Sequence, residues 1–449
     1  MEGTADMEQH LGPSMLIAFR AENVRSFRGE VELSLLATRL AERDVPREIP
    51  WRQDGKPISV LPAAGVFGAN ASGKSNLLMA MADMRMFVLQ SFRKGKQGSR
   101  LPRSPFLLGE DDGTAPSSYE VELVLNGVRH VYGFRIDSER VHEEWARSYP
   151  HGRPVLLLQR DGDVVQLGSS HRGKGRATEE ILRPNALFLS TAAATNHPVF
   201  MALFEWFQRN LRYADVRTRS ARQALTAEML EQDDRRQQLL GLLREADLGV
   251  IDVSRREYDP DFKEKMEKVF DIFRGEDPDE DVEEVEFDDF ELRLTHRAGE
   301  REVDLAGYQE SFGTMVWFGM IGLVIDALKE GSVLLADELE ASLHPALAAV
   351  LLDLFQSPRS NPRCAQLIFN SHEVTLMGDS GERGLGRDQI WFTEKDEDGA
   401  TRLYSLVELA PRRGEAIARR YLNGRYGGTP ILSPRRLERI AEPVGDADG

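Results

Sequence analysis

Eight residues in the first fifth of the chain carry the clearest chemistry. Residues 68–75, GANASGKS, fit the pattern GxxxxGK[ST], with an apolar run before them and helical spacing after them. In such a loop the backbone N–H groups point at a phosphate, Lys74 adds a cation, and Ser75 offers a hydroxyl to Mg²⁺. The pattern predicts a nucleotide-binding loop formed by Gly68, Asn70, Ser72, Gly73, Lys74, Ser75 and Asn76.

Two adjacent acids follow a buried strand much later in the chain. Residues 333–336, VLLA, are apolar, and Asp337 and Glu338 come directly after them. Open α/β sheets bind ligands at the carboxyl ends of their strands. Beside a phosphate loop, Asp337 is expected to hold Mg²⁺ together with Ser75. Glu338 is expected to act as the general base for an attacking water, so the two motifs together indicate hydrolysis of ATP.

The periodicity of the sequence predicts the elements that position both motifs. A short apolar strand at 60–67 precedes the loop, and a helix from 76 to about 92 follows it. Residues 364–372, CAQLIFNSH, form a second buried strand that ends in polar residues. Further strands are expected as a pair within 15–36, in a β-rich stretch at 117–166 with a hairpin turn at 126–127, at 282–287 and 290–296, and as a late pair at 389–395 and 402–409. Further helices are expected at 204–211, 221–246, 263–273, 313–328 and 343–356.

Composition limits the class of protein. The 449 residues carry a net charge of −17, with 41% apolar residues and one cysteine. No run of ~18 apolar residues occurs, so we expect a cytoplasmic protein without a membrane span. Residues 1–14 and 431–449 are expected to be a disordered leader and a flexible tail. DNA is a conceivable partner that the charge does not indicate, since nucleic-acid surfaces are usually basic. The acidic run Glu276–Glu291 fits a solvated stretch, with mimicry of nucleic acid as the alternative.

Two segments in the last third resemble ABC-type ATPases, particularly the SMC, RecF and OLD-like branch. Residues 337–345, DELEASLHP, resemble the segment that joins the two acids to the D-loop, which crosses the dimer interface. Residues 370–373, NSHE, resemble the switch-histidine segment, which implies that His372 contacts the γ-phosphate. The D-loop residues implied by the resemblance are Ser342, Leu343 and His344.

A third segment, QESFGT at 309–314, resembles the ABC signature. In that family a Ser and a Gly at a helix N-terminus bind the γ-phosphate held by the other subunit, and Ser311 and Gly313 occupy those places. NVRSF at 23–27 resembles the phrase that opens SMC and RecF heads. We find no Q-loop glutamine, since Gln90 lies within the first predicted helix. The resemblance implies composite sites, and therefore a homodimer or higher homo-oligomer formed through ATP.

Further phrases resemble the compact AAA-family ATPases of bacterial defence operons, the RloA/AbiL type. They are RPNALFLS at 183–190, FEWF at 204–207, LREADLGV at 243–250, RDQIWFTEK at 387–395 and YLNGRYGGTP at 421–430. The resemblance implies an ATP-dependent switch or scaffold in anti-phage, abortive-infection defence. It also implies a protein effector encoded nearby, which ATP-driven closure would control.

The expected fold is α/β, an ABC-ATPase head with a mixed P-loop sheet, an antiparallel β lobe and an inserted helical subdomain. Its expected parts are a leader at 1–14, an N-terminal ATPase lobe at 15–200, a helical and acidic insertion at 201–300, a C-terminal ATPase lobe at 301–430, and a tail at 431–449. The insertion could be a lid, an oligomer contact or an effector dock. Two other functions stay open: a RecF/SMC-like DNA-repair ATPase, and an OLD-type nuclease, for which the stretch after His372 is short.

Overall fold

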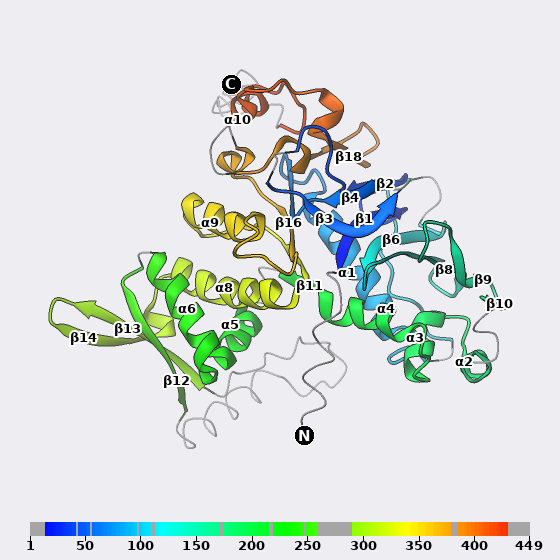
Figure 1. Ribbon diagram of the computed structural model, residues 1–449, viewed down its shortest axis with the longest axis horizontal. Coiled ribbons are helices and arrows are strands. Elements are labelled where there is room, and N and C mark those ends of the chain that lie inside the picture. The colour runs from blue at the N-terminus through cyan, green and yellow to red at the C-terminus, as the bar shows by residue number, and fades with distance from the viewer. Residues whose placement is uncertain are drawn as a thin grey trace, which may run out of the picture.

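The computed structural model describes residues 14–41, 44–53, 56–96, 98–109, 113–169, 175–214, 219–246, 248–258, 290–378 and 384–429. Within these residues the chain forms sheets of seven, six, three and two strands. Figure 1 shows the seven-stranded sheet on one side, the three-stranded sheet on the other, and the six-stranded sheet between them. Five predictions lie wholly or mostly outside the described residues: the leader, the helix at 263–273, the acidic run, the strand at 282–287 and the tail.

The seven-stranded sheet is antiparallel throughout, in the order β10-β9-β8-β7-β6-β1-β2. Its strands are β1 (Met15–Glu22), β2 (Val31–Ser34), β6 (Ser117–Leu125), β7 (Val128–Ile136), β8 (Val141–Tyr149), β9 (Val155–Asp161) and β10 (Val164–Leu167). Asn126 and Gly127 join β6 to β7 with φ angles of 52° and 75°, which suits a tight hairpin turn. The predicted antiparallel lobe is therefore confirmed. A separate ribbon pairs β3 (Arg47–Gln53) with β4 (Lys56–Val60).

The six-stranded sheet is mixed, in the order β11-β15-β16-β5-β17-β18. Its strands are β5 (Ala63–Gly68), β11 (Leu211–Ala214), β15 (Val333–Ala336), β16 (Gln366–Asn370), β17 (Ile390–Lys395) and β18 (Thr401–Ser405). All neighbours pair in parallel except β17 and β18. Every residue of β5, β15 and β16 is buried, as expected for parallel strands that are covered on both faces.

Helix α1 (Lys74–Gln90) connects the two large sheets. Its Phe87 ring lies 5.8 Å from Tyr119 of β6 and 6.0 Å from Phe134 of β7. Its other side contacts β5, β11 and β16. Helix α9 (Pro345–Gln356) also packs on β5 and β16, and its buried residues belong to a different core cluster from those of α1. The central sheet therefore has a helix layer on each face, with the antiparallel sheet stacked beyond α1.

Three short helices extend beneath the antiparallel sheet, and a smaller subdomain lies on the opposite side of the molecule (Figure 1). The short helices are α2 (Arg176–Ile181), α3 (Phe188–Ala194) and α4 (Met201–Glu205). The subdomain contains α5 (Arg219–Glu228), α6 (Asp233–Glu245) and the antiparallel strands β12 (Val250–Glu257), β13 (Phe290–Ala298) and β14 (Arg301–Ala306), and it packs on α8 (Phe312–Glu330). Near the C-terminus lies α10 (Ile417–Leu422).

Helix α8 is long and apolar enough to cross a membrane by length and composition. Most of it is buried inside the protein, where it packs on α5, α6 and β15. Gly322 allows α5 to approach closely, because a Cβ at this position would overlap the Thr226 side chain. In this structure α8 is a core helix.

The helix prediction at 204–211 was wrong at its end. Helix α4 stops at Glu205, one π-helical turn covers Trp206–Asn210, and Leu211 begins strand β11, which pairs in parallel with β15. Four residues are too few to show a period, so only pairing with β15 reveals this strand. The predicted insertion at 201–300 therefore supplies one edge of the central sheet as well as its own helices and strands.

Candidate active site

The candidate site lies where four neighbouring strands of the central sheet end. Strand β5 runs into the phosphate loop, β15 into the two acids, β16 into the histidine segment, and β17 ends at Lys395. A pocket of about 810 Å³ opens there, lined by Asn70, Ala71, Ser72, Gly73, Lys74, Ser75, Asn76, Glu338, Asn370, His372 and Lys395. Segments predicted separately from the sequence thus meet at one edge of the sheet, where α/β folds bind ligands.

The phosphate loop needs its glycines for two different reasons. Gly73 has a φ of 107°, and a Cβ there would also overlap the Thr401 hydroxyl. A Cβ on Gly68 would lie 2.6 Å from Ser72 Oγ and from the carbonyl oxygen of Thr393. The loop is therefore held tightly against the ends of β17 and β18.

Lys74 occupies the centre of the loop. Its Nζ donates to the carbonyl oxygens of Gly68 at 2.9 Å and Ala69 at 3.0 Å. Burial lowers the pKa of this ammonium, and the carboxylates of Glu340, Glu338 and Asp337 act in the opposite direction. A buried cation that donates to backbone carbonyls at the mouth of the loop is well placed to meet an anionic phosphate group.

Asn370, at the end of β16, joins the hydroxyl and the carboxylate that were predicted to hold Mg²⁺. Its Nδ2 donates to Asp337 Oδ1 at 2.5 Å and to Ser75 Oγ at 3.1 Å, and its Oδ1 accepts from the backbone N–H of Glu338 at 2.5 Å. One amide thus brings two oxygen ligands to one point. Mg²⁺ is usually held by one or two carboxylates together with waters and substrate phosphates, so this donor set fits the ion.

Glu338 and His372 extend into the same pocket from neighbouring strand ends. Glu338 is exposed and has a φ of 51°, which turns the chain sharply after β15. His372 is also exposed, and its backbone N–H donates to Glu340 Oε1 at 2.5 Å. Glu340 therefore fixes the histidine segment beside the acids. A carboxylate and an imidazole thus line the pocket beside the phosphate loop.

The signature and D-loop residues form a neighbouring surface outside the pocket lining. Ser311 caps α8, since its Oγ accepts from the Thr314 N–H at 3.1 Å. A Cβ on Gly313 would lie 2.7 Å from the carbonyl oxygen of Ser342, so the two segments contact each other. His344 caps α9 through Nδ1. The assignment of these residues to a second subunit's nucleotide stays a prediction.

The NVRSF segment at 23–27 connects helix α1, which follows the phosphate loop, to strand β18. Arg25 makes a bidentate ion pair with Asp83 of α1, with distances of 2.8 and 2.9 Å. Ser26 Oγ accepts from Asn76 Nδ2 at 2.8 Å and lies 2.8 Å from Thr401 Oγ1. Asn76, predicted to bind nucleotide, thus also fixes the first turn of α1 to this phrase.

Sequence reasoning missed three residues at the site: Asn370, Glu340 and Lys395. Asn370 and Lys395 stand at the ends of strands that were predicted, so the strand-end rule could have found them. Glu340 had no signal of its own, because its role depends on a contact with a residue 32 positions away. Gln90, the glutamine weighed for a Q-loop, ends α1 and is not among the pocket residues.

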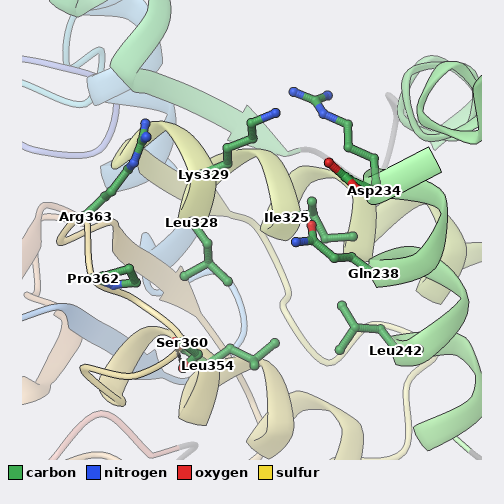
Figure 2. Close-up of a pocket in the computed structure, with 12 residues that line it drawn as sticks. Asp234, Gln238, Leu242, Ile325, Leu328, Lys329, Leu354, Ser360, Pro362 and Arg363 are labelled. Carbon is green, nitrogen blue, oxygen red and sulfur yellow. Dashed lines mark hydrogen bonds between the residues drawn. The ribbon is translucent and has the colours of Figure 1, made fainter. Parts of the chain in front are cut away.

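A second hollow, of about 620 Å³, lies between α6, α8 and the end of α9, and Figure 2 shows the residues that line it. Leu242, Leu328 and Leu354 lie on its apolar side, and Lys329 and Arg363 extend at its rim. None of the predicted site residues is among those that line it in the described part of the chain. This hollow is therefore separate from the phosphate-loop pocket and from the other predicted site residues.

The fold and the loop together define a P-loop domain. Its central sheet is parallel except for the β17–β18 pair, and an antiparallel β lobe lies beside it. Residues 63–378 match the family described as "AAA domain, putative AbiEii toxin, Type IV TA system", and the chain belongs to this family. No curated protein matches the chain.

Solved SMC heads share a distant likeness with the chain. An SMC head bound to the C-winged helix domain of ScpA is 12% identical, with a TM-score of 0.42, and the match covers 88% of this chain and 99% of that one. The SMC head domain from Thermotoga maritima is 12% identical, with a TM-score of 0.37 and coverage of 87% and 98%. An SMC head with an extended coiled coil, bound to the C-terminal domain of ScpA from Pyrococcus furiosus, is 11% identical, with a TM-score of 0.39 and coverage of 88% and 98%.

Proposed function

We propose that the protein binds and hydrolyses ATP and uses the nucleotide as a switch. The observation that carries this proposal is the convergence at one pocket of Lys74, Ser75, Glu338 and His372 from three strand ends, with Asn370 linking Ser75 to Asp337. Binding needs a phosphate cradle and hydrolysis also needs a base, and in this pocket the loop with Lys74 and the carboxylate of Glu338 are suited to these two roles.

The residues would divide the reaction as follows. The loop N–H groups and Lys74 bind the β- and γ-phosphates, while Ser75 and Asp337 would hold Mg²⁺, which supplies positive charge to the phosphate oxygens. Glu338 accepts a proton from the attacking water, whose oxygen forms a bond to the γ-phosphorus as the bond to the ADP oxygen breaks. His372 donates a hydrogen bond to the γ-phosphate. The products are ADP and phosphate.

Closure between two copies would complete each site. In this arrangement Ser311 and Gly313 of one copy meet the γ-phosphate held by the other, and Ser342 and His344 lie at the contact. Support comes from the contact between Gly313 and Ser342, which places both segments on one surface of the chain. Because each site would take groups from both copies, the rate of hydrolysis would depend on assembly.

The biological role we propose is control of a protein effector in anti-phage defence. The family description names a toxin of a toxin–antitoxin system, and the five phrases that resemble RloA/AbiL-type ATPases support the same setting. The net charge of −17 favours a protein partner over DNA as the direct target. A cytoplasmic location follows from this proposal.

The test separates binding from turnover. Glu338→Gln should retain ATP binding and lose nearly all hydrolysis, because it removes the base and leaves the loop intact. Lys74→Ala should lose affinity for ATP. Equilibrium titration of Mg·ATP and a phosphate-release assay measure the two effects. Hydrolysis by Glu338→Gln at the wild-type rate would contradict the assigned base, and wild-type protein that does not bind ATP would overturn the whole proposal.

A further inference from the structure

Lys395 is a pocket residue to which no motif gives a role. It is the last residue of β17, it is exposed, and it lines the pocket together with Lys74 and His372. Most exposed lysines are solvated charges without a ligand, so three further observations decide whether this one is different.

The first observation is the direction of its side chain. Side chains alternate along a strand, so Lys395 shares a face with Thr393. Thr393 Oγ1 lies 2.7 Å from Ser72 Oγ, within the phosphate loop. Lys395 is also paired with Thr401 of β18, whose Oγ1 lies 2.9 Å from the carbonyl oxygen of Ser72. Both neighbours on this face contact the loop, so the ammonium extends over it.

The second observation is that Lys395 is available to a ligand. Two of the three acids that follow it, Asp396 and Asp398, pair with Arg28 at 3.5 and 2.9 Å. Over the described ranges of the chain, Lys395 itself forms no ion pair, whereas Asp396 and Asp398 already have a cation. Its charge therefore has no counterion from the protein in the described residues.

The third observation is its position relative to the acids. In the sheet, β5 separates β17 from β16 and β15. Asp337, Glu338 and His372 follow β15 and β16, so the metal and the γ-phosphate belong to that flank. Lys395 stands on the opposite flank of the loop, toward the part of the nucleotide remote from the γ-phosphate.

We propose that Lys395 is a nucleotide-binding residue that contacts the α- and β-phosphates from the flank opposite the acids. This inference rests on the proposed function, because it requires a nucleoside di- or triphosphate in the loop. Lys395 then binds ATP and ADP alike and takes no part in the cleavage step. It adds affinity that persists after the γ-phosphate has left.

Calorimetric titration with ADP and with the non-hydrolysable analogue AMP-PNP, each with Mg²⁺, tests the assignment. An exposed ammonium–phosphate contact lies at the low end of charge-assisted hydrogen bonds, so Lys395→Ala should weaken both ligands about tenfold and by the same factor. The kcat of ATP hydrolysis should stay within about twofold of the wild type, since only ground-state binding is lost. Lys395→Arg should restore most of the affinity, because it keeps the charge.

The matched control is Lys329→Ala, which removes one exposed lysine charge far from the loop residues, at the end of α8. It should leave both affinities unchanged. Equal affinities in Lys395→Ala and Lys329→Ala overturn the inference, as does a loss confined to AMP-PNP, which would place Lys395 at the γ-phosphate. If Lys74→Ala loses binding while Lys395→Ala does not, the proposed function stands and only this assignment fails.

Discussion

Replacing Asn370 by alanine would remove the amide that joins the proposed Mg²⁺ ligands, Ser75 and Asp337, to the backbone of the proposed base, Glu338. Asn370 is fully buried, and its three hydrogen bonds go to Ser75, Asp337 and the backbone of Glu338. A typical hydrogen bond contributes about 0.5–1.5 kcal/mol net, so three of them predict a loss of about 2–4 kcal/mol in the free energy of unfolding.

The effect on hydrolysis should be larger than this loss of stability explains. Two of the three bonds end on the expected Mg²⁺ ligands, and removing such outer partners typically costs about 10–100-fold in metal affinity or activity. The third bond fixes the backbone of the base. We therefore expect kcat/KM for ATP to fall about 100-fold, which equals about 2.7 kcal/mol, and half-saturation by Mg²⁺ to shift to higher concentration.

Asn361→Ala is a close control. Asn361 is also fully buried and also makes three hydrogen bonds, to the backbone of Phe355 and twice to that of Ala365. Both variants should lose similar stability in urea unfolding. In a phosphate-release assay under folded conditions, with Mg²⁺ varied, only Asn370→Ala should be impaired. If Asn370→Ala hydrolyses ATP as fast as Asn361→Ala, the link between this amide and the reaction is refuted.

Three further predictions follow from the same structure. Gly73→Ala should lose ATP binding and lower the free energy of unfolding more than Gly152→Ala does in denaturant unfolding. Both glycines have positive φ angles (107° and 75°), but only a Cβ at 73 would overlap Thr401. Equal losses of stability in the two variants would contradict this. Glu144→Ala should lower the free energy of unfolding by about 3–5 kcal/mol, because it leaves the buried cation of Arg160 without its carboxylate. A loss below about 1 kcal/mol in denaturant unfolding would show that the two residues do not form a coupled pair. Chelating Mg²⁺ should stop phosphate release, because the proposed reaction needs the ion at Ser75 and Asp337; hydrolysis at an unchanged rate after chelation would contradict this.

The elements around the phosphate loop were predictable because their local signals agree. An apolar strand, a glycine-bearing loop and a helix occur in one stretch, and the acids follow another fully apolar strand. Parallel strands that are buried on both faces need continuous apolar residues, so β5, β15 and β16 stand out in the sequence. The order of the strands in the sheet came from the structure.

The parts that were missed depend on contacts between distant residues. Strand β11 has four residues and exists because its backbone pairs with β15. The role of Asn370 depends on the approach of Ser75, 295 residues away in sequence. The face that Lys395 presents is set by the pairing of β17 with β5 and β18. No window of the sequence contains this information, since it is created by tertiary packing.

The contacts around Gly73 have a consequence for the synthesis of the protein. Thr401, on β18, meets Ser72 across 329 residues and Ser26 across 375 residues. A ribosome that adds about 5–20 residues per second needs about 15–65 s to travel from the loop to Thr401. During this interval the nascent loop lacks the hydroxyl that packs against Gly73. We therefore expect the growing chain to gain affinity for ATP only after β18 has emerged from the ribosome.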